Sequence, residues 1–557
     1  MRFLEGRAVV VGCGALSFAL VWWMWGSLNQ VPVIHDEAAY LLQAKIFAAG
    51  NLTASARPLP DFFEQYHTFV RSVVAAKYPP GFSLLLVPGI WLGLPGIIPA
   101  LLTASTTCLL FLLARRQLGG LVALLSVVLS NTSAIALRFN PSYSSEVATS
   151  FLFLAGWWAL LQHWESGRTK WLLLLSLVVG FGAITRPLTM LAFALPAGVA
   201  SLLSIRKHGA WRSIPFALAV AVAVLSFMFV LNQRITGSWT RSAHAEYARL
   251  YLPEDRMGFG ETGKMPALPL STEQHYFEDA VRSIHRNHTP SNLPSIATAR
   301  LKFLAEDTWP TGIFGAALAA ISILVVPIAL GQLLWATVLT VFASYLLYAS
   351  QPSWTLYYLE LQPIFAFLTA AGALRVSQWL SGKLPQFKGH GPTRQTVMSM
   401  QATTLPPLPH QTGFLVLSVW LVGTSLVGLP VFRGEMTSLR HYHETFRQSL
   451  AALPSERSIV FVRYASKHHV DDSLVENDPD LDRAKTWIVH DRGSENARLL
   501  ALAPDRTPYL YHEWREGDRV RGEISPLERV EVGAAYRHAR QRPLSAVWTS
   551  EHHDSSW

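Results

Sequence analysis

The chain has 557 residues, of which half are hydrophobic and only 15% are charged. This composition excludes an ordinary soluble protein and indicates a polytopic membrane protein, whose helices each need about 20 apolar residues to cross a bilayer. A formal net charge of +9 would otherwise suggest a nucleic-acid partner. The basic residues, however, gather in short loops between apolar segments, which is typical of membrane topology, so we expect no nucleic acid.

Eleven apolar stretches predict membrane-spanning helices. They are residues 8–28, 97–114, 119–137, 147–164, 171–185, 188–205, 213–232, 311–330, 333–349, 355–374 and 413–430. The stretch 79–95 is apolar but short and rich in proline, so we expect an interfacial or re-entrant helix there. With that stretch left out of the count, the basic clusters fall on one side of the membrane. The N-terminus is therefore predicted to be cytoplasmic and the C-terminus extracytoplasmic.

The predicted fold class is a polytopic α-helical membrane protein with a small C-terminal extracytoplasmic α/β domain. The expected regions are a first transmembrane helix (1–28), a first outer loop with interfacial helices and an acidic pair (29–96), transmembrane helices two to seven (97–232), a large outer loop (233–310), transmembrane helices eight to ten (311–376), a cytoplasmic linker (377–412), an eleventh transmembrane helix (413–430) and the outer α/β domain (431–557). In that last domain the runs 459–462, 486–489 and 508–512 predict strands, and 495–502 predicts a helix.

An acidic pair, Asp36-Glu37, directly follows the first predicted span. Carboxylates are costly to hold near hydrocarbon, so acids at the outer mouth of a helix bundle indicate function. Asp36 is a candidate general base, with Glu37 in support and His35 as a group that tunes the pair or binds an acceptor. In the structural alternative, Asp36 caps a helix that begins near Glu37, and Glu37 stabilises the first turn of that helix. Both roles are compatible.

Two basic residues are candidates for binding a phosphate on the same side of the membrane. Lys77 precedes Tyr78-Pro79-Pro80-Gly81, and the paired prolines fix the chain just after it. The alternative is a snorkelling lysine that anchors an interfacial helix. Arg186 lies at the outer junction of the fifth and sixth spans, where an arginine between apolar helices requires an anion such as a lipid phosphate.

Further polar residues are predicted at the same outer face. Glu146 begins the fourth span, where it would orient an acceptor, coordinate a metal or complement the N-terminus of its own helix. Tyr357 and Tyr358 open the tenth span and would bind a phosphate or sugar, or belong to an interfacial aromatic belt. Glu360 lies a turn inside the same apolar helix.

A divalent metal bridging Glu146 and a phosphate is compatible with these residues, but no histidine cluster in the sequence demands one. The histidines of the outer loops lack metal-ligand spacing, and we expect most of them to be solvated. They are His67, His244, His275, His285 and His288.

Three motifs together resemble the GT-C superfamily of polyprenyl-phosphate-sugar glycosyltransferases, and in particular bacterial relatives of the protein O-mannosyltransferases and of the lipid A aminoarabinose transferases. The motifs are His35-Asp36-Glu37-Ala38-Ala39-Tyr40, Lys77-Tyr78-Pro79-Pro80-Gly81 and Tyr143-Ser144-Ser145-Glu146. The resemblance covers residues 8–376. It implies that Asp36 is the base with Glu37 beside it, that Lys77 contacts the lipid phosphate, that Glu146 is the second outer-loop acid, and that Tyr357 or Tyr358 contacts the phosphate.

These observations predict an inverting hexosyl- or pentosyltransferase of a bacterial inner (plasma) membrane. It would move a sugar from polyprenyl phosphate, held by Lys77 and Arg186, to the hydroxyl of a glycan, lipid or protein acceptor that Asp36 deprotonates. The alternative is a transporter or flippase of lipid-linked saccharides, whose intramembrane charges would line a path. The sequence favours the enzyme, because it lacks broken helices in matched halves and its polar residues cluster on one side.

Overall fold

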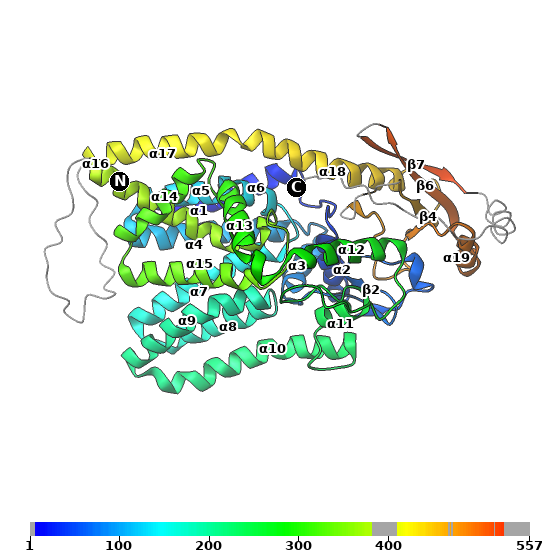
Figure 1. The fold of residues 1–557 in the computed structure, drawn as a ribbon, viewed down its shortest axis with the longest axis horizontal. Coiled ribbons are helices and arrows are strands. Elements are labelled where there is room, and N and C mark those ends of the chain that lie inside the picture. The colour runs from blue at the N-terminus through cyan, green and yellow to red at the C-terminus, as the bar shows by residue number, and fades with distance from the viewer. Residues whose placement is uncertain (1–5, 381–408, 466–467, 469–471, 517–518, 528–557) are drawn as a thin grey trace.

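The computed structural model describes residues 6–380, 409–465, 468, 472–516 and 519–527. A bundle of long helices forms one end of the molecule and a small sheet forms the other (Figure 1). Shorter helices and strands lie between these two parts. Most of the predicted cytoplasmic linker and the last thirty residues of the chain lie outside the described residues.

Each of the eleven predicted spans falls on helical residues of the bundle. The bundle comprises α1 (Arg7–Trp25), α4 (Ile97–Leu118), α5 (Gly120–Thr132), α7 (Ser145–Ser166), α8 (Thr169–Ala183), α9 (Pro187–His208), α10 (Ile214–Thr236), α14 (Ile313–Ile321), α15 (Ile328–Leu346), α16 (Gln362–Leu380) and α17 (Pro409–Val427). Within the described residues, seven helices are long and apolar enough to cross a membrane, or eight if one pair bent by 92° counts as a single span. The count of eleven crossings therefore stays a prediction.

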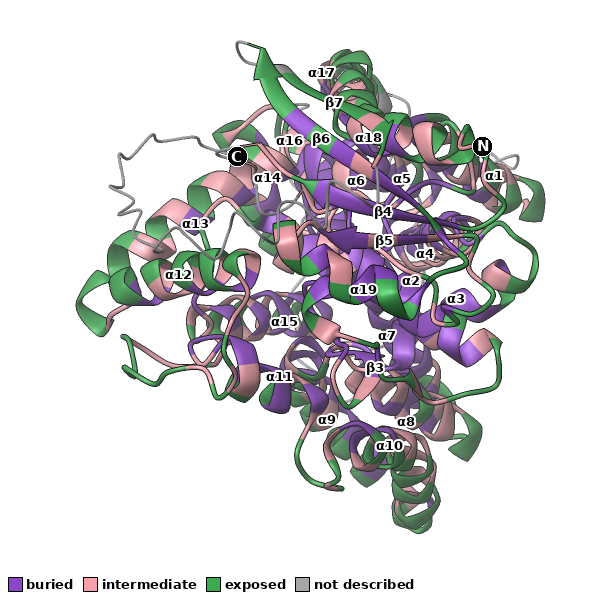
Figure 2. Ribbon diagram, turned by 90° about the vertical axis from the view of Figure 1, so that its right-hand side faces the viewer, coloured by how far each residue is buried: buried purple, intermediate pink, exposed green. Residues whose placement is uncertain are grey.

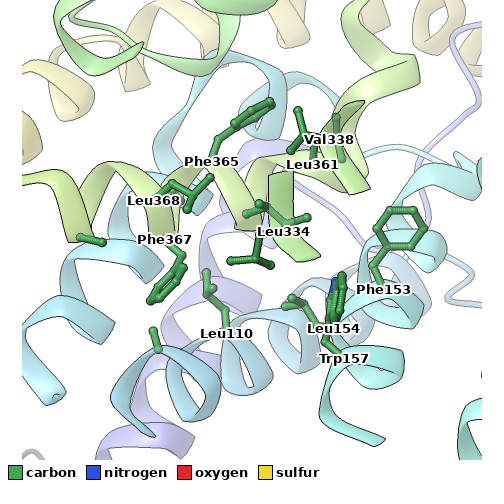
Figure 3. Close-up of a cluster of buried hydrophobic side chains, with 14 of the residues drawn as sticks. Leu110, Phe153, Leu154, Trp157, Leu334, Val338, Leu361, Phe365, Phe367 and Leu368 are labelled. Atoms are coloured by element: carbon green, nitrogen blue, oxygen red, sulfur yellow. The ribbon is translucent and has the colours of Figure 1, made fainter. Parts of the chain in front are cut away.

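The burial of the helices shows which of them face lipid. In the segment Thr355–Leu380, 89% of the apolar window is buried inside the protein, whereas in Ala210–Thr236 only 6% is. A helix that is apolar all round and uncovered by protein is stable only in a bilayer. One large cluster of buried hydrophobic side chains joins these helices and includes Leu334 of α15, Trp157 of α7 and Phe365 of α16 (Figure 3).

The segments at the end of the bundle that faces the C-terminal sheet, named the outer mouth after the predicted topology, are short. They are α2 (His35–Ala48), β1 (Ala54–Ser55), the 3-10 turn η2 (Pro60–Phe62), β2 (Thr68–Phe69), β3 (Val73–Ala76), α3 (Gly81–Trp91), α6 (Ala134–Phe139), α11 (Ala243–Tyr251), α12 (Thr272–Asn287), α13 (Leu293–Thr308) and η6 (Thr355–Leu361). The three strands pair antiparallel in the order β1-β3-β2. The proline-rich stretch forms the 11-residue helix α3, which is too short to cross a bilayer.

The C-terminal domain, which the sequence predicts to be extracytoplasmic and which is named the outer domain for that reason, contains a four-stranded sheet of order β5-β4-β6-β7. The strands β5 (Thr486–His490) and β6 (Thr507–Glu516) pair parallel to the central β4 (Ser458–Arg463), and β7 (Arg519–Pro526) pairs antiparallel to β6. The strands β4 and β5 are mostly buried, while the far end of β6 is exposed (Figure 2).

The three predicted strands and the predicted helix, α19 (Asn496–Leu502), are present in this domain. Strand β7 was not predicted, because its alternating charged residues and its glycine give no apolar run. Nor was α18 (Leu429–Ala451), which carries the chain from α17 to the sheet and occupies the first part of the predicted α/β domain.

Candidate active site

Asp36 lies in the first turn of α2, at the outer mouth of the bundle. Its Oδ1 accepts a hydrogen bond from the hydroxyl of Tyr78 and lies 3.1 Å from Nε2 of His67 and 3.6 Å from Nε2 of His35. Its Oδ2 makes no hydrogen bond within the described residues, and the side chain is 35% exposed. One carboxylate oxygen is therefore held in place, and the other is available to an incoming group.

The electrostatics of this cluster keep Asp36 ionised. Burial raises the pKa of Asp36, but the hydrogen bond from His67 and the nearby imidazoles outweigh it, and the net pKa lies well below the usual range. Burial, with Lys77 and His35 nearby, lowers the pKa of His67 to about 3. His67 is thus neutral at pH 7. Because a carboxylate only accepts, the tautomer must be the one that donates Nε2–H to Asp36.

His67 has an unusual backbone conformation, with φ of 60° in the left-handed region that non-glycine residues rarely adopt. Its N–H donates to the hydroxyl of Tyr247 at 2.9 Å, and its carbonyl accepts from the N–H of Lys77 at 2.9 Å. Strained conformations of this kind cost about 1–3 kcal/mol and persist where the surroundings enforce them. The surroundings of His67 therefore aim its ring at Asp36.

The expectation that the outer-loop histidines are mostly solvated was wrong. His67, His285 and His288 are buried, at 4%, 1% and 2% exposure. His67 in particular meets Asp36 only through the fold, since 31 residues separate them in the chain and no local pattern marks the pair.

Glu37 has a structural role. Its Oε2 accepts from the N–H of Val33 at 2.6 Å and its Oε1 accepts from the N–H of Tyr143 at 2.8 Å. The carboxylate thus satisfies backbone donors before the first turn of α2 and ties that turn to the loop before α7. The predicted capping is present with the roles exchanged: Glu37 caps the helix, and Asp36 faces the histidines.

Lys77 is buried and forms an ion pair with Asp255, with Nζ 2.6 Å from Oδ2. The hydroxyl of Tyr348 donates to the other oxygen of Asp255 at 2.9 Å. Burial raises the pKa of Asp255, but Lys77 and His244 outweigh that and lower it well below its usual range. Lys77 therefore points into the protein and is not a snorkelling anchor. Asp255 was not predicted as a site residue, because it is one of many charged residues in the loop 233–310 and no local pattern marks it.

Arg186, which directly precedes α9, lies between two acids. Its guanidinium bonds Glu146, and its Nε lies 3.0 Å from Oε1 of Glu360. It also donates to the hydroxyl of Tyr345 at 2.5 Å. The protein itself thus supplies the anion that an arginine at this depth requires. The structure brings Arg186 and Glu146 together, and with them Glu360, which the sequence singled out.

The two tyrosines of η6 diverge. Tyr357 stacks on Tyr345, with ring centroids 5.0 Å apart, and lies 5.8 Å from the guanidinium of Arg186. Tyr358 is 2% exposed and packs on Phe342 in the hydrophobic core. Successive side chains of a 3-10 turn point about 120° apart, so only one of the pair can face the polar cluster. Tyr357 is that residue, and the structure does not bring Tyr358 to the site.

A relay of side-chain contacts and one close approach of the backbone join these groups into one centre. Tyr40 stacks on Tyr78, with centroids 4.6 Å apart, and donates to Oγ of Ser145, which in turn accepts from Arg186 at 3.2 Å. Gly81 brings the segment after Lys77 against the turn before Arg186: its N–H donates to the carbonyl of Ile184 at 2.7 Å. A Cβ at Gly81 would lie 2.2 Å from Oγ1 of Thr185, so only glycine fits there.

A separate cavity of about 370 Å³ lies on another face of α2, between this helix, α18 and the outer domain. Leu41, Lys45, Arg447 and Glu476 are among its lining residues, whereas Asp36 is not. Burial raises the pKa of Glu476 to about 8. This cavity is distinct from the polar centre around Asp36.

The apolar bundle with a polar centre at one mouth defines an integral membrane protein. Residues 95–232 match the family model of dolichyl-phosphate-mannose-protein mannosyltransferase. No curated protein sequence matches the chain.

Among solved structures, the chain is similar to ArnT from Cupriavidus metallidurans bound to undecaprenyl phosphate, at 13% identity and a TM-score of 0.51 over 93% of this chain and 98% of that chain. It is also similar to the apo state of the same ArnT, at 13% identity and a TM-score of 0.52 over 90% and 88% of the two chains. A weaker similarity, at 10% identity and a TM-score of 0.41, is to the oligosaccharyltransferase AglB from Archaeoglobus fulgidus, over 90% of this chain and 69% of that chain. The chain thus has the fold of the GT-C glycosyltransferases, as the resemblance predicted.

Proposed function

We propose that this protein is an inverting glycosyltransferase that moves a hexosyl or pentosyl group from a polyprenyl-phosphate donor to an extracytoplasmic acceptor hydroxyl, in a bacterial inner membrane. The observation that carries the proposal is the state of Asp36: Oδ1 is fixed by Tyr78 and His67, and Oδ2 is open. The fold, shared with a protein solved with undecaprenyl phosphate, supports a lipid-linked donor.

In the proposed reaction, Oδ2 of Asp36 takes the proton of the acceptor hydroxyl. The acceptor oxygen then attacks the anomeric carbon from the side opposite the phosphate, and a new C–O bond forms. The bond between that carbon and the phosphate oxygen breaks, and polyprenyl phosphate leaves with the electron pair. Because a phosphate is a good leaving group when cations stabilise it, no general acid is required.

Lys77 is the better of the two candidates for holding that phosphate. It faces one carboxylate, Asp255, whereas Arg186 faces both Glu146 and Glu360. A phosphate that approached Arg186 would be repelled by two carboxylates, whereas at Lys77 it would compete with the single carboxylate of Asp255. We therefore assign phosphate contact to Lys77 and Tyr357, and assign to Arg186 the role of fixing Glu146.

A divalent cation fits better beside Asp36 than beside Glu146, whose carboxylate already bonds Arg186. His35, Asp36 and His67 each offer one ligand atom, and these atoms lie within 4.8 Å of one another. A bound cation would help to neutralise the donor phosphate. It would also bind the carboxylate of Asp36, which we assign as the base, and would compete with the acceptor proton for it. The test therefore includes assays with added chelator and with added metal.

The test is transfer from defined donors by the purified protein in nanodiscs, with release of free polyprenyl phosphate as the readout. We expect release by wild type and a loss of about 100-fold or more in Asp36→Asn, which keeps the shape of the side chain but removes the base. Equal release by both proteins would remove Asp36 as the base. Binding of the donor without any release would favour the transport of lipid-linked saccharides instead.

A further inference from the structure

One of the two hydrophobic cores of the outer domain is completed by residues from the first outer loop. Phe62 at the end of η2 and Phe63 directly after it are 1% and 2% exposed and lie within the core on one face of the sheet. The ring of Phe62 meets Phe461 with centroids 6.4 Å apart, and the ring of Phe63 meets Trp487 at 5.6 Å. The buried remainder of this core is Ile459, Leu481, Val489, Leu499, Leu500 and Ala503.

Polar contacts fix the same loop segment on both sides of the two phenylalanines. Before them, Arg57 donates to the carbonyls of Asp478 and Pro479, at 2.6 and 3.1 Å. Next to them, Arg492 donates to the carbonyl of Asp61 at 2.8 Å, and Nε2 of His490 contacts the carbonyl of Glu64, also at 2.8 Å. The domain therefore holds the backbone of residues 57–64 at several points.

His67 follows three residues after the last of these contacts. Its strained backbone and its buried ring need a fixed chain on both sides. On the C-terminal side, the chain is fixed by β3 and by the N–H of Lys77, which donates to the carbonyl of His67. The N–H of His67 itself donates to the hydroxyl of Tyr247 in α11. On the N-terminal side, the outer domain holds the chain up to Glu64. Glu273 of α12, which pairs with Arg492 and His490 of the domain, accepts a hydrogen bond through its carbonyl from the hydroxyl of Tyr66 at 3.0 Å.

We infer that the outer domain positions the catalytic centre: by burying Phe62 and Phe63 it holds His67 against Oδ1 of Asp36. This rests on the proposed function, since His67 acts through Asp36. In this inference Phe62, Phe63 and His67 are positioning residues, and the domain serves the chemical step itself whichever acceptor the enzyme uses.

The chain offers a matched control for a loss of domain stability. Successive side chains of β4 point to opposite faces of the sheet, so Val460 and Val462 lie in a second core on the other face. Phe446 of α18 belongs to that core, is 5% exposed, and meets Tyr511 with centroids 4.8 Å apart. Phe446→Ala removes as large a ring from the same domain but leaves residues 57–67 untouched.

The first experiment is amide hydrogen exchange of the full-length protein in nanodiscs, followed by mass spectrometry of peptides that cover residues 64–69. We expect faster exchange there in Phe63→Ala and unchanged exchange in Phe446→Ala, with Phe63→Leu close to wild type. Unchanged exchange at residues 64–69 in Phe63→Ala, or an equal increase in Phe446→Ala, would overturn the inference. This readout does not depend on knowing the donor or the acceptor.

The second experiment is a double-mutant cycle on transfer activity. We expect His67→Ala and Phe63→Ala each to lower kcat by about ten-fold or more with little change in donor KM, because a misplaced base slows the chemical step. The double variant should lose less than about two-fold beyond His67→Ala alone, since both changes act through one contact. Multiplicative losses would overturn the inference. An inactive wild type with coupled exchange would instead contradict the proposed function and leave the coupling standing.

Discussion

At the scale of single residues, the site consists of charged groups with partners that the fold supplies. Asp36, Lys77 and Arg186 stood out in the sequence because charge near hydrocarbon is costly. Their partners did not stand out, because His67 and Asp255 come from distant loops with no local pattern. Of the two roles predicted for Glu37, the structure shows the one in the first turn of α2, where its side chain reaches back to the backbone before the helix, while Asp36 faces the histidines. The sequence thus identifies charged residues that are costly to place near hydrocarbon, whereas only the tertiary structure shows which residues they contact.

The ion pair of Lys77 and Asp255 gives the first residue-scale prediction. Asp255→Ala leaves a buried ammonium without its carboxylate, and we expect a loss of about 3–5 kcal/mol in stability. Lys77→Met combined with Asp255→Ala should recover most of that loss, because no unpaired charge remains. Donor KM should stay raised in the double variant, since the phosphate ligand is gone. Thermal unfolding and donor titration measure the two effects; full recovery of donor KM would remove Lys77 as that ligand.

The second residue-scale prediction concerns pH. The pKa of Asp36 is depressed, so the proposed base is ionised at neutral pH. Activity should fall only in acid, where His67 protonates near its lowered pKa of about 3 and the carboxylate follows at lower pH. His67→Ala removes a hydrogen bond that lowers the pKa of Asp36. The acid limb of kcat against pH should therefore move to higher pH in that variant. A limb that stays in place would show that His67 does not act on Asp36.

At the scale of elements, close contacts between loops position the side chains. Gly81 lets the turn before α3 lie against the turn before α9, which brings the segments of Lys77 and Arg186 together. Arg440 of α18 is 3% exposed and donates to the carbonyls of Met24 and Pro141, so it joins the end of α1 to the loop before α7. The sequence showed a helix where α3 lies but could not show this docking, because the requirement for glycine comes from Thr185, more than a hundred residues away.

The contact at Gly81 gives the prediction at this scale. Gly81→Ala would force its Cβ against Thr185, and we expect a loss of about 1–3 kcal/mol together with lower activity. Gly198→Ala in α9 is the matched control, because a Cβ there meets nothing within 4 Å. Unfolding temperature and transfer rate would be compared for the two variants. Equal behaviour of both would contradict a role for the close approach.

At the scale of the whole molecule, the outer domain and the bundle act as one body. Besides Phe62 and Phe63, Glu273 of α12 lies 3.2 Å from Nη2 of Arg492 and 3.6 Å from Nδ1 of His490. The strands of the domain could be predicted because their apolar runs are local. Its attachment could not, because Phe62-Phe63 in a polar loop gives no sign of which surface covers it.

The prediction at this scale is that acid weakens the attachment of the outer domain to α12. Burial raises the pKa of Glu273, but His490 and Arg492 outweigh it and lower the pKa to about 2 from 4.5. The stabilisation by this carboxylate is therefore full above about pH 5 and is lost as the pH falls toward 2. Exchange in α12 and β5 should rise over that range in wild type and depend less on pH in Glu273→Gln. Identical pH profiles would exclude Glu273 as the group responsible.

The helices α17 and α18 together form one long helical segment (Figure 1). Its part Thr412–Ala451 runs for 40 residues, or about 60 Å at 1.5 Å per residue. A bilayer core takes up only about half of that length. If α17 crosses the bilayer as predicted, the length of this helical segment and the contacts of residues 57–64 together set the height of the sheet. In the proposed transfer, an acceptor that contacts the sheet would have to do so at that height and still reach Asp36, which restricts acceptors by their size before any contact selects among them.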